Sequence, residues 1–236
     1  MASHLRPSSL PSSPRSNKTR VDQQLDKLKT IISSPLATID TLCNGFRMLV
    51  SIYNSIEEMM CAPSNHESLC QTLQRKTVEG ELGQSPVLLD LCNAMQESFI
   101  ELKMIVQELL LGLKRGDDAA AHVKAYIQLT KKAHKQFKVC KTITSDEKDC
   151  RVVKVLAEAR LITTLLLKST SWFLSKQFQT PKRSIISKTF QKGKVVCEAD
   201  QLQVLECSIR NLESGVELLY RRLILCRVSL LNTLSS

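Results

Sequence analysis

Histidine and cysteine are the residues of this chain best suited to catalysis or metal binding, but their spacing matches no catalytic motif. The four His lie at positions 4, 66, 122 and 134, and the nine Cys include no Cys-x-x-Cys pair. The sequence contains no phosphate-binding Gly loop, no Gly-x-Ser-x-Gly turn and no His-Glu-x-x-His pair. Adjacent carboxylates such as Glu57-Glu58 diverge around a helix. We therefore expect a protein that is not an enzyme and has no cofactor.

Cys61, His66 and Cys70 form the one cluster that could suggest zinc, because tetrahedral zinc sites use these residue types. Only three ligands are local, however, and their spacing matches no zinc module. Buried thiols in a reducing compartment explain the cysteines better, since a small apolar side chain suits a helix interface. We therefore expect no metal site.

Residues 1–20 are rich in Ser and Pro, basic and free of acidic residues, so no core can form there. Arg6, Ser9 and Pro11 form an Arg-x-x-Ser-x-Pro string, in which phosphate on Ser9 would suit the Arg cluster of a 14-3-3-type phosphoserine reader. Three interpretations remain open: a disordered basic arm, this docking motif, or an organelle transit peptide. We expect a cytoplasmic protein, with a plastid or the surface of an internal membrane as alternatives.

An apolar stretch over 161–174 contains the single Trp and is followed by cations without acids. A membrane span needs about 20 apolar residues, so these fourteen, with Lys168 among them, predict a buried helix. An anionic membrane surface is the alternative partner, and it would contact Trp172, Lys176, Lys182, Arg183, Lys188, Lys192 and Lys194. Nucleic acid is disfavoured, because only Phe178 and Phe190 could stack on bases there.

Apolar residues recur at three- and four-residue intervals in several long segments, which is the pattern of amphipathic helices. The same spacing occurs from Ile39 to Met60 and from Leu88 to Leu113. Near the C-terminus it holds for Leu202, Leu205, Ile209, Leu212, Val216, Leu219, Leu223, Cys226 and Leu230. Such a stripe is stable only when another helix covers it. The sequence leaves open whether the C-terminal stripe pairs within the chain or across a dimer.

Proline, serine and glycine predict where the first helices begin and end. A short helix from Val21 to Ile32 precedes one that begins at Ser34-Pro35, with Ser as the N-cap, and ends near Cys61. A weaker helix follows and fades at Gly80 and Gly83, and Ser85-Pro86 then opens the third long helix.

The third long helix is predicted to end at Gly116, after cations in its last turn. Residues 119–143 are rich in lysine and predict an exposed helix, with Val123, Ile127, Thr130 and His134 on one line. A further helix covers 152–173, a basic irregular loop covers about 177–196, and the last helix begins near Cys197.

Composition agrees with this reading, because aromatic residues make up only 4% and the chain has only 7 Gly and 7 Pro. We expect an all-α protein: a single antiparallel bundle of about five to seven long helices over residues 21–236, preceded by the disordered basic arm.

The chain resembles the Bypass-type plant family over nearly all of its length. His4–Ser16, Val21–Lys29 and the run from Ile39 to Leu69 are similar to its opening and first helices. The most specific likenesses are VEGELGQSPVLLDLCNAMQESFIELK, with Asp90-Leu91-Cys92 at its centre, and LLYRRLILCRVSLLNTLS, which spans Leu218 to Ser235. Gly80, Gly83 and Pro86 depart from the regular Leu-rich pattern expected there. The resemblance implies a helical protein of root and shoot development, with no established enzymatic activity and no functional residues to transfer.

Overall fold

The structure is a computed structural model that describes residues 14–34, 38–137, 150–178 and 192–235; for 14–19, 72–74 and 192–198 it describes the backbone alone. The described chain is all α, as predicted, and contains no strand. In chain order its helices are α1 (Pro14–Ser33), α2 (Ile39–Cys61), α3 (Pro63–Cys70), α4 (Thr72–Arg115), α5 (Ala120–Gln136), α6 (Arg151–Lys176) and α7 (Lys192–Ser235).

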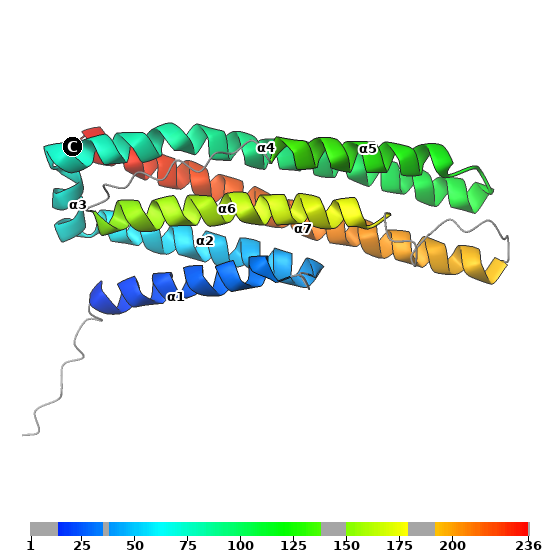
Figure 1. Ribbon diagram of the computed structural model, residues 1–236, viewed down its shortest axis with the longest axis horizontal. Coiled ribbons are helices and arrows are strands. Elements are labelled where there is room, and N and C mark those ends of the chain that lie inside the picture. Colours follow the sequence, from blue (N-terminus) through cyan, green and yellow to red (C-terminus); the bar gives the residue numbers. More distant parts are fainter. Residues whose placement is uncertain (1–13, 35–37, 138–149, 179–191, 236) are drawn as a thin grey trace, which may run out of the picture.

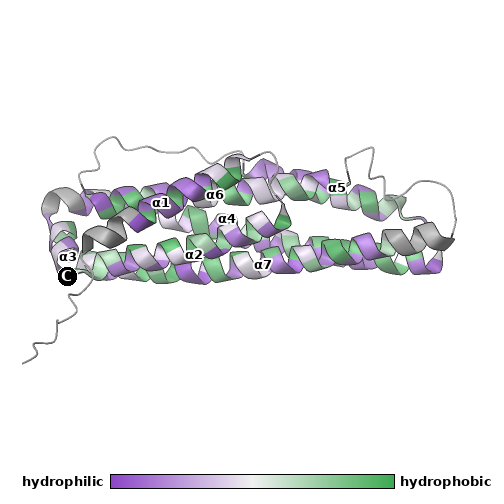
Figure 2. Ribbon diagram, turned by 90° about the horizontal axis from the view of Figure 1, so that it is seen from below, coloured by the Kyte–Doolittle hydropathy of each residue, from purple (hydrophilic) through white to green (hydrophobic). Residues whose placement is uncertain are grey.

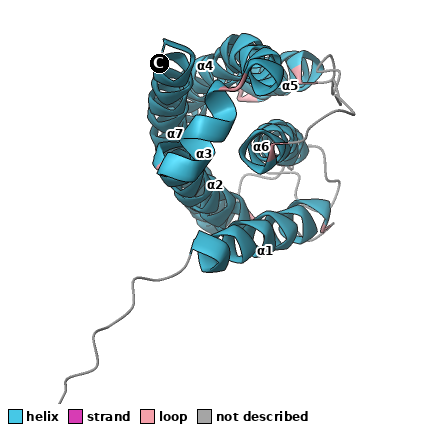
Figure 3. Cartoon of the chain, turned by 90° about the vertical axis from the view of Figure 1, so that its left-hand side faces the viewer, coloured by secondary structure: helices cyan, strands magenta, loops and turns pink. Residues whose placement is uncertain are grey.

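The two longest helices, α4 and α7, run antiparallel along the whole molecule (Figure 1). At about 1.5 Å of rise per residue, each 44-residue helix is roughly 66 Å long. α2 packs against α7 on one side, and α5 packs against α4 on the other. α6 lies inside this arrangement and contacts α1, α2, α4 and α5 (Figure 3). The short α3 closes the end at which α2 finishes and α4 begins (Figure 1).

The predicted apolar stripes form the core. All nine positions of the C-terminal stripe are buried, which answers the question that the sequence left open: this stripe pairs within the chain, against α4 and α2. Figure 2 shows apolar and polar residues interspersed along the long helices, as amphipathic packing requires. The apolar stretch of α6 is also buried on most of its surface, as predicted.

Two helix starts differ from the prediction. α1 begins at Pro14 and not at Val21. α2 begins at Ile39 and not at Pro35, because Thr38 caps it: the Thr41 amide donates to Thr38 Oγ1 at 3.3 Å, and the Thr38 amide donates to Thr41 Oγ1 at 2.7 Å. This reciprocal pair satisfies the backbone N–H groups of Thr38 and Thr41 at the start of α2.

The predicted interruption near Gly80, Gly83 and Pro86 was wrong. α4 is continuous from Thr72 to Arg115, with Pro86 inside it. Its predicted end is confirmed, since Gly116 adopts the left-handed conformation at φ 77° and its N–H donates to carbonyls of the last turn. α7 begins at Lys192, five residues before the predicted Cys197, and residues 179–191 of the predicted basic loop lie outside the described residues.

α5 is less exposed than its lysine content indicates. Its buried residues are Tyr126, Leu129, Thr130 and Ala133, and they face α4 and α6. The expectation of an exposed helix was therefore wrong for this side. Of the predicted line, Thr130 is buried and Val123, Ile127 and His134 are partly buried, while Lys131, Lys132 and Lys135 remain exposed. The Tyr126 hydroxyl donates to the Leu174 carbonyl at 3.3 Å and so joins α5 to the end of α6.

The glycines of two helices give a matched test of the packing. Gly80 has no neighbour within 4 Å of an added Cβ, whereas at Gly215 an added Cβ would lie 3.1 Å from the Phe46 Cβ of α2. Gly80→Ala should stabilise the protein by about 0.5–1 kcal/mol, because alanine loses less backbone entropy in a helix. Gly215→Ala should destabilise it, because overpacking costs about 1–3 kcal/mol.

Urea unfolding of both variants measures this difference. Equal stabilisation by the two substitutions would show that α2 and α7 do not approach each other as closely as the structure has them.

Candidate functional site

Pro86 lies inside α4 and leaves one backbone acceptor without its helical partner. A proline has no N–H, so the Leu82 carbonyl, four residues earlier, loses the donor that any other residue would supply. An acceptor without a donor is costly to the extent that it is shielded from water, and this carbonyl is partly buried. The chain replaces the hydrogen bond from another helix.

Arg227 of α7 supplies the missing donor. Its Nη1 donates to the Leu82 carbonyl at 2.7 Å and also donates to the Ser85 hydroxyl. The Ser85 hydroxyl in turn donates to the same Leu82 carbonyl at 2.7 Å. The helix continues across the proline because its orphaned carbonyl accepts two hydrogen bonds, one of them from a charged group.

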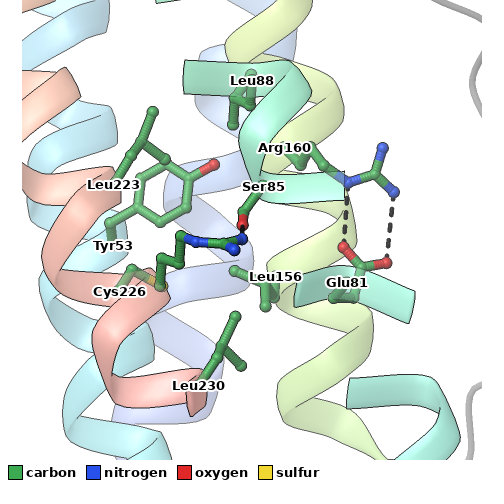
Figure 4. A pocket seen from close by; sticks show the side chains of 10 residues that line it. Tyr53, Glu81, Ser85, Leu88, Leu156, Arg160, Leu223, Cys226 and Leu230 are labelled. Atoms are coloured by element: carbon green, nitrogen blue, oxygen red, sulfur yellow. Dashed lines mark hydrogen bonds and ion pairs between the residues drawn. The ribbon is translucent and has the colours of Figure 1, made fainter. Parts of the chain in front are cut away.

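Two ion pairs complete a polar layer across four helices, which we define as Glu57, Glu81, Ser85, Arg160, Arg222 and Arg227. Glu81, only 7% exposed, binds Arg160 of α6 through two hydrogen bonds of 3.0 and 3.3 Å (Figure 4). Glu57 of α2 accepts hydrogen bonds from Arg222 and, at 2.7 Å, from the Ser229 hydroxyl, both on α7. Buried charges require such partners, so the layer fixes the four helices relative to one another.

A cavity of about 20 Å³ lies beside the polar layer, large enough for about one water molecule. Its walls come from α2, α4, α6 and α7, and Figure 4 shows Tyr53, Leu88, Leu156, Leu223 and Leu230 around it. Most of this lining is apolar, so the cavity is a packing feature between the four helices.

The ionisable groups that line the cavity are not poised for chemistry. Burial raises the pKa of the Cys226 thiol to about 12, so this cysteine stays protonated at neutral pH. Burial also raises the pKa of Tyr53, whose hydroxyl hydrogen-bonds with Thr163 at 3.2 Å. The Glu81 carboxylate is held by Arg160. These groups are suited to hold helices together, and none of them is an activated nucleophile.

The side of α7 that faces away from the bundle is also apolar over the same stretch. We define the outer face of α7 as Leu218, Ile224, Leu225, Val228 and Leu231, each of which is between 39% and 55% exposed. From Leu218 to Leu231 it extends for about 20 Å along the helix. Large exposed apolar patches mark interaction sites in soluble proteins. The outer face is therefore the candidate interaction surface, and the polar layer on the inner side of the same turns fixes its position.

Of the residues predicted to contact an anionic surface, the structure brings two together. Trp172 is 45% exposed, and the Lys176 Nζ lies 5.7 Å from the centroid of its ring, in a cation–π arrangement. The end of α6 that carries them is fixed against α5, where Tyr126 and Phe178 form an edge-to-face pair with ring centroids 4.5 Å apart. Lys182, Arg183 and Lys188 lie outside the described residues, as do the side chains of Lys192 and Lys194.

The remaining predictions from the sequence concern the N-terminal motif, the possible zinc cluster and a membrane span. Arg6, Ser9 and Pro11 lie outside the described residues. The Cys70 thiol donates to the Thr233 carbonyl at 3.6 Å, and within the described chain no three His, Cys, Asp or Glu side chains are placed to hold a metal ion. Among the described helices, none combines the length and apolarity needed to cross a membrane.

The formal net charge of +10 comes from three segments that contain no Asp or Glu. Residues 1–20 carry four Lys and Arg, and residues 119–145 and 176–194 carry six each. These sixteen cations exceed the net charge, so the rest of the chain is net acidic. Any attraction to an acidic partner therefore originates in these three segments.

Sequence reasoning missed the outer face of α7, although a signal for it was present. Ten of the 14 residues from 218 to 231 are apolar, whereas one buried stripe requires only about half of them. The excess indicates a second apolar face. The role of Arg227 had no such signal, because its partner in α4 lies more than 140 residues away.

A double-mutant cycle can measure how far the Arg227 guanidinium replaces the N–H that Pro86 lacks. Arg227→Ala should destabilise the protein by about 2 kcal/mol, because it removes a charged donor from a partly buried carbonyl and leaves only the Ser85 hydroxyl there. Pro86→Ala restores an N–H to the Leu82 carbonyl, so in that background Arg227→Ala should cost about 1 kcal/mol less. Urea unfolding of the two single variants and the double variant gives this coupling energy.

Arg210→Ala is the control, because Arg210 lies on the same helix, is itself exposed and pairs with Glu206 of that helix. It should change stability by less than about 1 kcal/mol in both backgrounds. Additive effects of Pro86→Ala and Arg227→Ala would contradict the compensation.

Comparison with known proteins gives a family for this fold. No curated protein and no solved structure matches the chain. The family model described as Protein BPS1 matches residues 45–233, a range that includes most of α2, all of α3 to α6, the polar layer and the outer face of α7. Because this match covers most of the sequence, the chain belongs to the Protein BPS1 family, the BYPASS1 plant family.

Proposed function

We propose that this protein is a non-enzymatic module of root and shoot growth and development that binds a protein partner through the outer face of α7. Membership of the Protein BPS1 family is consistent with a plant developmental protein. The observation that carries the molecular part is the outer face itself: five large aliphatic side chains exposed on consecutive turns of one helix.

The surroundings of the outer face support an interaction surface. Leu219, Leu223 and Cys226 anchor the same turns in the core, and Arg222 and Arg227 tie them to α2 and α4. The aliphatic side chains are thus presented on a helix that is held from two sides. A pre-organised surface loses less conformational entropy when a partner binds, so such a face favours binding.

The cavity supports a function without catalysis. Its volume of about 20 Å³ suits a water molecule and not a substrate. Of the charged groups that line it, Glu81 and Arg160 form an ion pair, and Arg227 is hydrogen-bonded to α4. A catalytic site of the usual kind joins a concave pocket with titratable groups that are free to react. The described residues around this cavity provide neither a pocket of substrate size nor titratable groups that are available to react.

The proposal predicts that charge on the outer face abolishes function without unfolding the protein. In plants that lack the protein, a chain with Leu225→Glu and Val228→Glu should fail to restore root and shoot growth, because a carboxylate cannot be buried against an apolar partner. Both side chains are exposed, so the melting temperature of the purified variant should stay close to that of the wild type.

Val204→Glu is the matched control, since Val204 lies on the same helix, is 66% exposed and is outside the outer face. It should restore growth. Full restoration by the Leu225 and Val228 variant, at the same protein level, would refute the outer face as the functional surface.

A second candidate function is docking on an anionic membrane surface. It is favoured by the exposed Trp172 beside Lys176 at the end of α6, where the basic segment 176–194 begins. Tryptophan prefers the membrane–water interface, and each Lys or Arg near an anionic surface contributes about 1 kcal/mol.

Flotation with anionic and neutral vesicles tests this second candidate. The protein should bind phosphatidylserine vesicles and not phosphatidylcholine vesicles, and the combined Trp172→Ala and Lys176→Ala variant should bind at least about fivefold more weakly. Lys76→Ala removes an exposed cation of α4 and should change nothing. Equal binding to both vesicle types would rule this function out.

The N-terminal segment enters the proposal on sequence grounds alone. Arg6, Ser9 and Pro11 remain a predicted docking motif for a 14-3-3-type phosphoserine reader. Phosphate there would add a regulated attachment through a segment of the chain other than α7.

A further inference from the structure

We propose that the outer face of α7 binds a second copy of this chain, with the two α7 helices antiparallel about a two-fold axis between Ile224 and Leu225. This inference rests on the proposed function, because it names the partner of the same surface. Its argument comes from the order of residues along α7, from the charges there and from the position of α7 in the bundle.

The outer face, taken together with the exposed Arg221, has the same spacing of residues in both directions along the helix. The residues that face outward over these turns are Leu218, Arg221, Ile224, Leu225, Val228 and Leu231, at intervals of three, three, one, three and three. In an antiparallel pair centred between Ile224 and Leu225, each position of this set meets another position of the set. A two-fold interface needs such self-complementarity, because each copy contributes the same surface.

In this arrangement Leu218 of one copy meets Leu231 of the other, and Ile224 meets Leu225. Arg221 meets Val228, and its aliphatic stem can cover the valine while the guanidinium remains at the edge of the interface. That guanidinium is already bound by Glu217, one turn earlier, at 2.5 Å. The pairing therefore buries aliphatic side chains and leaves no charge without a partner.

The charges select the antiparallel orientation. In a parallel pair Arg221 would lie beside Arg221 and Glu217 beside Glu217, and like charges in contact are destabilising. In the antiparallel pair the two Arg221 residues are seven positions apart, about 10 Å along the helix axis. From Leu223 to Ser236 the only charged residue is Arg227, which is directed inward to α4.

The position of α7 makes such a pairing accessible. Figure 3 shows α7 at the outer edge of the bundle, with α2 and α4 on either side of it. The face is also unsuited to an anionic lipid surface, because its one cation, Arg221, is bound to Glu217. A self-complementary and mainly apolar face at the edge of a bundle, whose one cation is already paired within its own helix, fits a second copy best.

The test is the mass of the full-length protein in solution. Light scattering during size exclusion should give twice the chain mass of 26.5 kDa at micromolar concentration. Leu225→Glu should raise the dimer dissociation constant at least about tenfold, because it places two carboxylates at the axis. Val204→Glu should leave the dimer intact. A wild-type protein that is monomeric at all accessible concentrations would overturn the inference.

Mixed variants test the orientation. Leu218→Glu and Leu231→Lys should each weaken the dimer alone and form a heterodimer when mixed, because the antiparallel pair brings these positions together. Leu218→Glu mixed with Leu218→Lys should not recover, since the two positions lie about 20 Å apart. Recovery of the second mixture and not of the first would overturn the antiparallel arrangement.

These results separate the two proposals. A monomeric wild-type chain whose Leu225→Glu and Val228→Glu variant still fails to restore growth would remove the second copy as partner and leave the outer face as the functional surface. A dimer that Leu225→Glu does not disturb would place the contact elsewhere and overturn the inference.

Discussion

The hydrogen bond from Arg227 to the Leu82 carbonyl is the interaction on which the arrangement of α4 and α7 depends. Pro86 removes one donor from the interior of a 44-residue helix, and the chain replaces it from a helix that arrives more than 140 residues later. A guanidinium can reach this carbonyl only at one register of the two helices. The polar contact thus selects one alignment of α7 along α4, which aliphatic packing alone specifies weakly.

The same register places three kinds of residue on the last turns of α7. Leu219, Leu223 and Leu230 enter the core, while Arg222 and Arg227 hold α2 and α4 from the flanks. The third side of these turns is the outer face, which is exposed to solvent and is also apolar. The two segments that carry the family resemblance most specifically, 78–103 and 218–235, are therefore joined by Arg227. Lys103, at the end of the first segment, also forms an ion pair of 2.5 Å with Glu213 of α7.

The sequence could predict the helices whose stripes are regular, because each buried position of α2, α4 and α7 recurs at helical intervals. It could not predict the continuity of α4, since the rule that proline ends a helix is local and the donor that overrides it comes from Arg227. The start of α2 failed for a related reason: Ser34-Pro35 and Thr38 are both good caps, and the Thr38–Thr41 pair decides between them. The outer face of α7 was not predicted, because the regular spacing of the buried stripe already accounts for an amphipathic helix and gives no reason to look for a second apolar side.

The distribution of charge bears on whether two such chains can associate. A net charge of +10 opposes self-association. From Leu223 to Ser236, however, the sequence has one charged residue, Arg227, and it is directed inward to α4. The basic segment 176–194 ends near the start of α7, more than 30 residues and about 45 Å from Leu225 along the helix axis. That separation is large compared with the screening length of about 8 Å at physiological ionic strength. Repulsion from this segment therefore falls away before it reaches the outer face, and the apolar contact there is opposed mainly by the entropy of association.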